Sequence, residues 1–169
     1  SDTPQPNTAY GRSKLRAEQY LQSLGDKLPT VIFRPTGVYG PREKDYFLMA
    51  KSIKGHTDFS VGFRRQEITF IYVKDLVGAI YRAVEKHVTG RAYFVSDGGI
   101  YESRAFSDFI QQELGNPWVL RIKSPLWLLK LISYTAGWGA SLMGKTCTLN
   151  KDKYQIMKQR NWQCDIAPL

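Results

Sequence analysis

Segments with a helical spacing of apolar residues alternate with short strand-like runs along most of this chain, and this alternation constrains the fold more than any other feature. From Tyr10 to Leu24 a spacing of three and four residues predicts one helical face, and Gly25 stands where a glycine often ends a helix. The apolar run over residues 30–34 predicts a buried strand, which Pro35 ends. Helix, strand, helix and strand in succession indicate an α/β domain with parallel strand pairing.

The alternation continues towards the C-terminus. After a loop rich in glycine and proline at residues 35–43, the sequence predicts helices over residues 45–54, 75–86 and 103–114, and strands over residues 59–63, 68–73, 92–96 and 118–122. Asp45 and Asp75 are the expected N-caps of the first two helices, because a short carboxylate accepts free backbone N–H groups of a first helical turn. An apolar segment follows Pro125, and the final residues are polar apart from Trp162.

Composition limits the class of protein. The 169 residues are 43% apolar and 23% charged, which indicates one globular domain. Cys147 and Cys164 are too few for a disulfide framework or a zinc knuckle, and His56 and His87 have no third ligand beside them, so we expect no metal site. The apolar segment over residues 126–143 is short for a membrane span and contains a lysine. We therefore expect a soluble, cytoplasmic protein with no membrane span.

The chain is basic, with 24 Lys and Arg against 15 Asp and Glu and a net charge of +9. A nucleic-acid-binding surface is one explanation, but the basic residues are spread along the chain and do not cluster on one helix. An acidic second half or a phosphate-bearing substrate explains the charge equally well. We therefore favour a small-molecule partner and no nucleic acid, and keep a nucleic-acid-binding module as an alternative.

A tyrosine and a lysine stand four residues apart at Tyr10 and Lys14, in the segment YGRSK. The ordinary pKa of tyrosine is about 10, and an ammonium group one helical turn away favours the phenolate. The pair is therefore suited to moving a proton to or from an alcohol or a ketone. The same spacing recurs at Tyr154 and Lys158, so spacing alone does not choose between the two pairs.

Further motifs follow the first pair in a recognisable order. YGRSK precedes FRPTGVYGP, IYVKDL and AYFVSDGG, which cover residues 33–41, 71–76 and 92–99. This order resembles the C-terminal part of the extended short-chain dehydrogenase/reductases, the group that contains the NAD-dependent nucleotide-sugar epimerases and dehydratases. Near the C-terminus, GKTCTLN and NWQCD look closest to the sterol- and hydroxysteroid-dehydrogenase-like or dihydroflavonol-reductase-like branch.

The resemblance implies the C-terminal fragment of a Rossmann-type, NAD(P)-binding fold together with a smaller substrate-binding lobe. Residues 1–97 would be mostly the end of the Rossmann-type domain, with part of the lobe inserted around residues 41–70, and residues 98–169 would complete the lobe. No G-x-G-x-x-G turn follows a strand in these residues. We therefore expect the dinucleotide-binding half and the family's catalytic Ser or Thr to be absent, and the 169 residues alone to be inactive.

The resemblance also implies roles for single residues in a NAD- or NADP-dependent epimerase, dehydratase or dehydrogenase. Tyr10 would be the general acid and base at a hydroxyl or carbonyl of a sugar nucleotide or sterol-like substrate. Lys14 would lower the pKa of the tyrosine and hydrogen-bond to the nicotinamide ribose. The residues expected to contact the cofactor are Tyr10, Lys14, Pro35, Thr36, Gly37 and Val38. Thr36 and Arg42 would face the substrate, and a homodimer is a further hypothesis.

One motif favours a different class of function. The octapeptide from Gly139 to Thr146 matches the pattern G-x-x-x-x-G-K-[ST], in which backbone amides hold phosphates and the lysine, here Lys145, reaches the terminal phosphate. Such a loop follows a strand, whereas residues 125–135 favour a helix. A non-catalytic phosphate-binding module therefore stays as an alternative, beside nucleic-acid binding.

Overall fold

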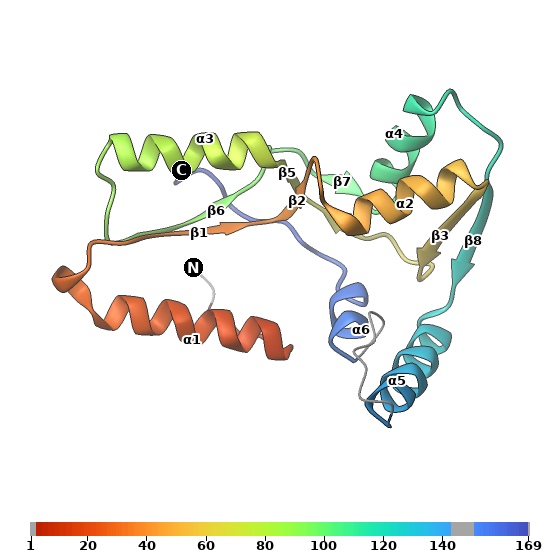
Figure 1. The fold of residues 1–169 in the computed structure, drawn as a ribbon, viewed down its shortest axis with the longest axis horizontal. Coiled ribbons are helices and arrows are strands. Elements are labelled where there is room, and N and C mark those ends of the chain that lie inside the picture. The colour runs from red at the N-terminus through yellow and green to blue at the C-terminus, as the bar shows by residue number, and fades with distance from the viewer. Residues whose placement is uncertain (1–2, 143–150, 169) are drawn as a thin grey trace.

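The structure is a computed structural model that describes residues 3–142 and 151–168. Two parts lie side by side along the long axis of the molecule (Figure 1). The first part contains α1 (Ala9–Ser23), β1 (Val31–Pro35), α3 (Val73–Glu85) and β6 (Arg91–Val95). The second part contains α2 (Lys44–Lys54), β3 (Thr57–Val61), α4 (Ala105–Glu113) and β8 (Leu120–Ser124), with α5 (Leu126–Leu142) and α6 (Lys151–Met157) after them.

The first part is a layered α/β arrangement. β1 and β6 pair in parallel, from Val31 opposite Arg91 to Pro35 opposite Val95. α3 lies on one side of this pair and α1 on the other (Figure 1). Both strands that the sequence predicts here, and their parallel pairing, are confirmed to within one residue at each end.

A second short strand, β2 (Gly37–Tyr39), continues the line of β1 and pairs in parallel with β5 (Phe70–Tyr72). Thr36 stands at the junction, and its N–H donates to the carbonyl of Val95 at 3.1 Å. The N–H of Gly37 then donates to the carbonyl of Thr69 at 3.3 Å. The loop prediction for this segment is therefore wrong in part, because a neighbouring strand supplies backbone partners that the glycine- and proline-rich pattern does not reveal.

In the second part β3 pairs in parallel with β8. α2 packs against both α4 and β3. β4 (Glu67–Ile68) and β7 (Tyr101–Glu102) form a short antiparallel pair, and β7 contacts α4. The strand predicted over residues 68–73 is divided between β4 and β5, and β8 begins two residues later than its prediction.

The capping residues of two helices differ from the prediction. Glu43, and not Asp45, is the N-cap of α2, where its carboxylate accepts the N–H groups of Asp45 at 2.9 Å and Tyr46 at 2.6 Å. Tyr72 is the N-cap of α3, and Asp75 lies in the first turn. An acidic residue anywhere in a first turn favours the helix dipole, so its presence indicates a helix start without identifying the cap.

Aromatic rings join the two parts of the molecule. Tyr39 of β2, Tyr46 of α2, Phe70 of β5 and Phe106 of α4 form a cluster, in which the Tyr46 and Phe106 centroids are 4.4 Å apart and those of Phe70 and Phe106 are 4.9 Å apart. Tyr39 contacts Phe106 at a centroid distance of 5.4 Å. Rings packed at these distances add stability beyond the apolar area they bury, and they hold the strands against α2 and α4.

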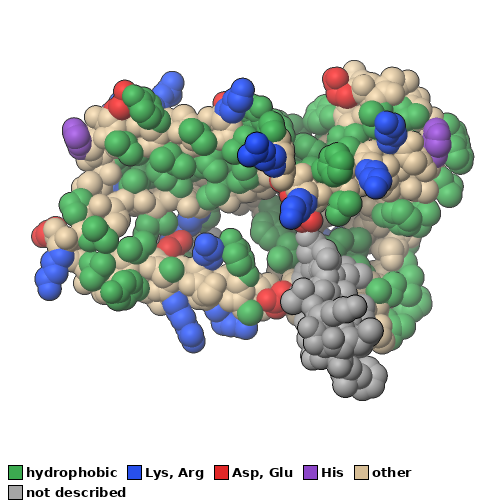
Figure 2. All heavy atoms as spheres, in the orientation of Figure 1, with side chains coloured by type: hydrophobic (Ala, Val, Ile, Leu, Met, Phe, Trp, Pro, Cys, Tyr) green, Lys and Arg blue, Asp and Glu red, His purple; other side chains and the backbone are tan. Residues whose placement is uncertain are grey.

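The outer side of α3 stays apolar and exposed. Val77, Tyr81 and Val84 are each more than half exposed. Figure 2 shows hydrophobic side chains gathered over this helix. The broad apolar face of α3 is therefore only partly covered in the described part of the chain.

The segment after α6 returns alongside β4. The N–H of Glu67 donates to the carbonyl of Arg160 at 2.8 Å, and the N–H of Trp162 donates to the carbonyl of Glu67 at 2.9 Å. The Thr69 hydroxyl donates to the carbonyl of Trp162 at 2.7 Å. These bonds fasten residues 160–162 to the strands.

Within residues 3–142 and 151–168, no helix is both long and apolar enough to cross a membrane. The same residues contain no group of three His, Cys, Asp or Glu side chains that could hold a metal ion. Cys164 is a free thiol, whereas Cys147 lies outside the described residues.

Candidate active site

Tyr10 and Lys14 lie one turn apart at the start of α1. Thr8 is the N-cap, and its hydroxyl accepts the N–H of Gly11 at 3.0 Å. The ammonium nitrogen of Lys14 is 5.5 Å from the centroid of the Tyr10 ring. The helix therefore brings the two side chains together as their spacing predicts, with the cation over the ring.

The position of α1 places this pair at a defined end of the sheet. α1 runs antiparallel to β1, so its first turn lies towards the carboxyl end of β1, where β2 begins (Figure 1). In open α/β sheets, ligands bind outside the carboxyl ends of the parallel strands. The Tyr10 residue is 67% exposed and so is accessible to a ligand from this side.

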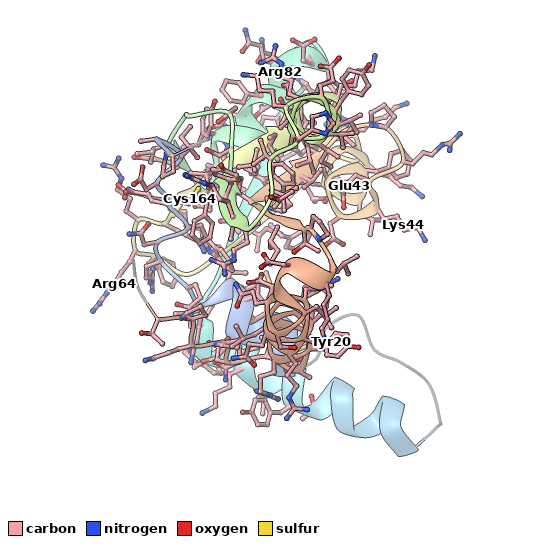
Figure 3. The ribbon with its side chains drawn as sticks, turned by 90° about the vertical axis from the view of Figure 1, so that its left-hand side faces the viewer. Tyr20, Glu43, Lys44, Arg64, Arg82 and Cys164 are labelled. Carbon is pink, nitrogen blue, oxygen red and sulfur yellow. The ribbon has the colours of Figure 1, made fainter. Side chains whose placement is uncertain are left out.

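A cavity of about 690 Å³ separates the first half of α1 from β1 and β6. Lys14 and Glu18 line it from the helix, Arg34 from β1, and Cys164 from the C-terminal segment. Figure 3 shows Cys164 beside the strands, whereas Tyr20, further along α1, projects away from them. The volume lies within the range of small-molecule sites.

Arg34 is already paired inside this cavity. Its guanidinium donates to Glu18 at 2.5 and 3.1 Å and lies 5.4 Å from the ring centroid of Phe94. The hydrogen bond to Glu18 raises the pKa of Arg34 above its ordinary value. Glu18 thus compensates the charge of Arg34, and Lys14 lines the same cavity with its ammonium over the Tyr10 ring.

The segment predicted to pass the cofactor is the junction between β1 and β2. Pro35 is the last residue of β1, and the hydroxyl of Thr36 donates to the carbonyl of Val95 at 3.4 Å. The N–H groups of Thr36 and Gly37 donate within the sheet, so they are occupied by the fold itself. Val38 is half-buried in β2.

Gly37 answers a packing requirement. A Cβ atom at this position would lie 2.7 Å from the hydroxyl of Tyr46 and 3.1 Å from the ring of Phe70. Both rings belong to the aromatic cluster, in which their centroids are 5.8 Å apart. The glycine therefore allows α2 to pack closely against β2.

Arg42 lies in a tight turn before α2. The N–H of Glu43 donates to the carbonyl of Gly40 at 3.2 Å, and Arg42, third in the turn, has a φ of 73°. This is the geometry of a type II turn, which favours glycine at that position. The strained backbone holds an exposed arginine at the edge of the second part, and its predicted contact with substrate stays a prediction.

The second tyrosine–lysine pair has a similar local geometry. The ammonium nitrogen of Lys158 is 5.8 Å from the centroid of the Tyr154 ring. Tyr154 lies in α6, and the chain then turns to run beside β4 without a following strand of the first part. The ring-to-ammonium geometry is therefore similar in the two pairs. They differ in the helix that carries them, which is α1 for Tyr10 and α6 for Tyr154.

The phosphate-loop match lies in an unsuitable context. Its first residues, from Gly139 to Leu142, belong to α5, and the remainder to Thr146 lies outside the described residues. A phosphate-binding loop joins a strand to the N-terminus of a helix, whereas a helix precedes this match.

Three other tyrosines near the strands have raised pKa values. Burial raises the pKa of Tyr46 to about 12. Burial, together with the nearby Asp97 carboxylate, raises the pKa of Tyr39. The Tyr101 hydroxyl donates to Asp97 at 2.8 Å, and this hydrogen bond raises the pKa of Tyr101. These phenols hold their protons tightly and are poor candidates for a base at neutral pH.

One contact at the site has no counterpart in the sequence analysis. A carboxylate oxygen of Asp152, in the first turn of α6, accepts the N–H of Ala9 at 2.9 Å. The two residues are 143 positions apart, and no spacing or motif links them. A run of polar residues near the C-terminus carries no local signal for such a contact.

Comparison with known proteins decides the family. The model of the NAD dependent epimerase/dehydratase family matches residues 1–96, which is more than half of the chain. The chain belongs to this family. The resemblance drawn from YGRSK and the three later motifs is thereby confirmed.

Proteins similar to this chain include enzymes named for different reactions. It is 27% identical over 168 residues to a UDP-glucose 4-epimerase of Vibrio cholerae, across 96% of this chain and 51% of the relative. It is 24% identical over 132 residues to a decarboxylating sterol-4-alpha-carboxylate 3-dehydrogenase of Schizosaccharomyces pombe, across 72% of this chain and 39% of the relative. The chain thus spans about half the length of the epimerase and a smaller share of the sterol dehydrogenase.

A solved structure agrees on the fold. A UDP-N-acetylglucosamine 4-epimerase from Methanobrevibacter ruminantium matches 99% of this chain and 48% of its own, with a TM-score of 0.71 and 17% identity. The predicted α/β, Rossmann-type fold class is confirmed by this likeness and by the parallel pairing of the strands.

Proposed function

We propose that this chain supplies the acid–base pair of a NAD(P)-dependent epimerase, dehydratase or dehydrogenase, with Tyr10 as the catalytic acid and base. The supporting observation is the position of Tyr10 and Lys14, 5.5 Å from ring to ammonium, at the sheet end where β1 passes into β2. Because the chain spans only about half the length of the UDP-glucose 4-epimerase relative, we propose this activity for the full-length enzyme and not for these residues alone.

The chemistry of the pair follows from its charges. Tyr10 would exchange a proton with a hydroxyl or carbonyl oxygen of the substrate, and the Lys14 ammonium would stabilise negative charge that develops on the phenol oxygen during the transfer. The bound cofactor supplies the acceptor and donor of a hydride. A lysine ammonium is also a suitable donor to a ribose hydroxyl, so these residues fit the nicotinamide end of NAD(P).

The described residues fit only that end of the cofactor. The N–H groups of Thr36 and Gly37 are engaged in the sheet, so residues 35–38 would offer side chains and carbonyls to the nicotinamide. The pyrophosphate needs a glycine turn at a helix N-terminus, and the 169 residues contain no G-x-G-x-x-G after a strand. The dinucleotide would therefore be held mainly by residues beyond these.

For the substrate we propose a sugar nucleotide or a sterol-like alcohol, in a cytoplasmic enzyme. The named activities of the two relatives support these classes. Thr36 and Arg42 are the proposed substrate-facing residues, and the division into a Rossmann-type part and a substrate lobe, split near residue 97, is part of the same proposal. The lobe would include the insertion around residues 41–70.

The deciding experiment compares matched variants of the two tyrosines in the full-length enzyme. Tyr10→Phe keeps the ring and removes the proton, so turnover should fall about a hundred- to ten-thousand-fold, the usual contribution of a positioned acid or base. Tyr154→Phe should keep near wild-type turnover, although a second lysine, Lys158, lies over the Tyr154 ring in the same way. Steady-state kinetics measure the turnover of both variants. Circular dichroism checks that both remain folded.

Lysine variants complete the comparison. Lys14→Met should lower turnover, because negative charge that develops on the phenol oxygen of Tyr10 would lose its neighbouring cation. Lys158→Met should leave turnover near the wild-type value. Full activity in Tyr10→Phe together with loss in Tyr154→Phe would assign the chemistry to the other pair.

A further inference from the structure

We infer that Asp152 is a positioning residue for Tyr10, acting from α6 on the first turn of α1. The carboxylate accepts the N–H of Ala9 at 2.9 Å, and Ala9 directly precedes Tyr10. The inference rests on the proposed role of Tyr10 and adds a residue from the far end of the chain to that site.

The backbone of Tyr10 is held on both sides. Before it, the N–H of Ala9 donates to Asp152. After it, the N–H of Gly11 donates to the hydroxyl of Thr8, a residue only 6% exposed. The Tyr10 residue itself is 67% exposed, so little packing surrounds the ring, and these two backbone anchors fix where the side chain leaves the helix.

The charge of Asp152 suits this position. The first N–H groups of a helix have no partner inside the helix and carry the positive end of its dipole. A carboxylate that accepts one of them forms a charge-assisted hydrogen bond, which is stronger than one between neutral groups. An amide at position 152 would keep an acceptor oxygen and lose the charge.

α6 is itself anchored to the strands, so the contact reaches beyond one helix. The chain after α6 is bonded to Glu67 through Arg160 and Trp162. It then lines the cavity beside Lys14 with Cys164. Asp152 therefore links a segment fastened to β4 with the helix that carries Tyr10 and Lys14.

The first measurement is hydrogen exchange in the full-length enzyme. Asp152→Ala should raise exchange at the Ala9 amide at least about fivefold, the effect of losing a typical capping acceptor. Asp152→Asn should raise it less. Exchange in β1 and β6 should not change. Asp26→Ala removes a carboxylate from the other end of α1, beyond Leu24, and should leave the Ala9 amide unchanged.

The second measurement is kinetic. Misplaced catalytic groups lose rate, and we expect Asp152→Ala to lower kcat about tenfold with little change in the KM for NAD(P). Asp152→Asn should recover most of that loss because its amide oxygen still accepts the Ala9 N–H. A simple loss of folded enzyme would lower the active fraction of both variants and would show as a reduced melting temperature.

Each outcome bears on the inference. Unchanged exchange at Ala9 in Asp152→Ala would show that the contact is not made, and the inference would fall. Increased exchange with unchanged kcat, in an enzyme that needs Tyr10, would show a contact without a positioning role and would equally overturn it. Full activity of Tyr10→Phe would refute the proposed function separately, since the exchange result does not depend on turnover.

Discussion

At the scale of single residues, Gly37 shows how a site residue can be required by packing. A side chain there would meet the Tyr46 hydroxyl at 2.7 Å and the Phe70 ring at 3.1 Å. The resemblance of the sequence to the family implies a cofactor contact for this glycine. The geometry gives it a structural task in addition, namely the close approach of α2 to β2.

Gly37→Ala should therefore destabilise the protein by about 1–3 kcal/mol, the usual range for overpacking a filled site. Gly78→Ala is the matched control, because Gly78 lies within α3 with nothing within 4 Å of an added Cβ. It should stabilise by about 0.5–1 kcal/mol, through the better helix propensity of alanine. Urea unfolding measures both changes.

A second substitution tests the stated cause. Tyr46→Phe removes the hydroxyl that the new Cβ would meet. In the Tyr46→Phe background, Gly37→Ala should cost clearly less than in the wild type. Equal costs in the two backgrounds would show that the clash with the hydroxyl is not the cause.

The raised pKa of Tyr46 predicts how the stability of the protein changes at alkaline pH. Burial raises its folded-state pKa to about 12, against about 10 in the unfolded chain. Between these values the folded state holds a proton that the unfolded state has lost, so stability falls as the pH rises from about 10 towards about 12. Unfolding free energies measured across this range should fall less steeply in Tyr46→Phe. The exposed Tyr20→Phe is the control and should fall as steeply as the wild type.

At the scale of elements, α2 shows how a helix start is defined. Glu43 precedes the helix in an extended conformation, and its carboxylate folds back onto two N–H groups of the first turn. Asp45, which the sequence analysis chose, is already inside the helix. Both are acidic residues near one helix start, and only the backbone conformation at position 43 decides between them.

Glu43→Ala should destabilise the protein by about 1 kcal/mol, the typical cost of losing a capping side chain. Glu85→Ala is the control, because Glu85 is the last residue of α3, where a negative charge is unfavourable to the helix dipole. It should be neutral or slightly stabilising. Thermal unfolding compares the two, and a similar loss in both would contradict the capping role.

At the scale of the whole molecule, the two parts are joined to each other, but one apolar helix face stays exposed. The aromatic cluster holds them together, whereas the outer face of α3 keeps Val77, Tyr81 and Val84 exposed. The chain spans about half the length of its UDP-glucose 4-epimerase relative. The proposed acid–base pair, the cavity beside it and the proposed part of a substrate lobe lie among these residues, in which no G-x-G-x-x-G turn follows a strand.

A polypeptide of these 169 residues should therefore fold but bind NAD(P) only weakly and show no turnover. The pyrophosphate would lack the glycine turn and helix N-terminus that supply most of its contacts. Isothermal titration calorimetry at micromolar protein should show no saturation, with the full-length enzyme as the positive control. A micromolar dissociation constant for the shorter polypeptide would contradict this account.

Several features of the fold and site could be predicted from the sequence because they depend on neighbours along the chain. The spacing of three and four residues from Tyr10 produces α1, and the same helix brings Lys14 over the tyrosine ring. The apolar run before Pro35 produces β1. The order of the four motifs identified the family, since each motif is read within a few residues.

Other features were decided only by the tertiary structure, because they join positions that are far apart in the chain. β2 exists as a strand because β5, about thirty residues later, pairs with it. The requirement for glycine at position 37 comes from a hydroxyl on α2. The contact between Asp152 and Ala9 spans 143 positions, and neither residue carries a local pattern that points to the other. Backbone pairing, close packing and distant hydrogen bonds depend on where the folded chain brings its segments, which local spacing does not encode.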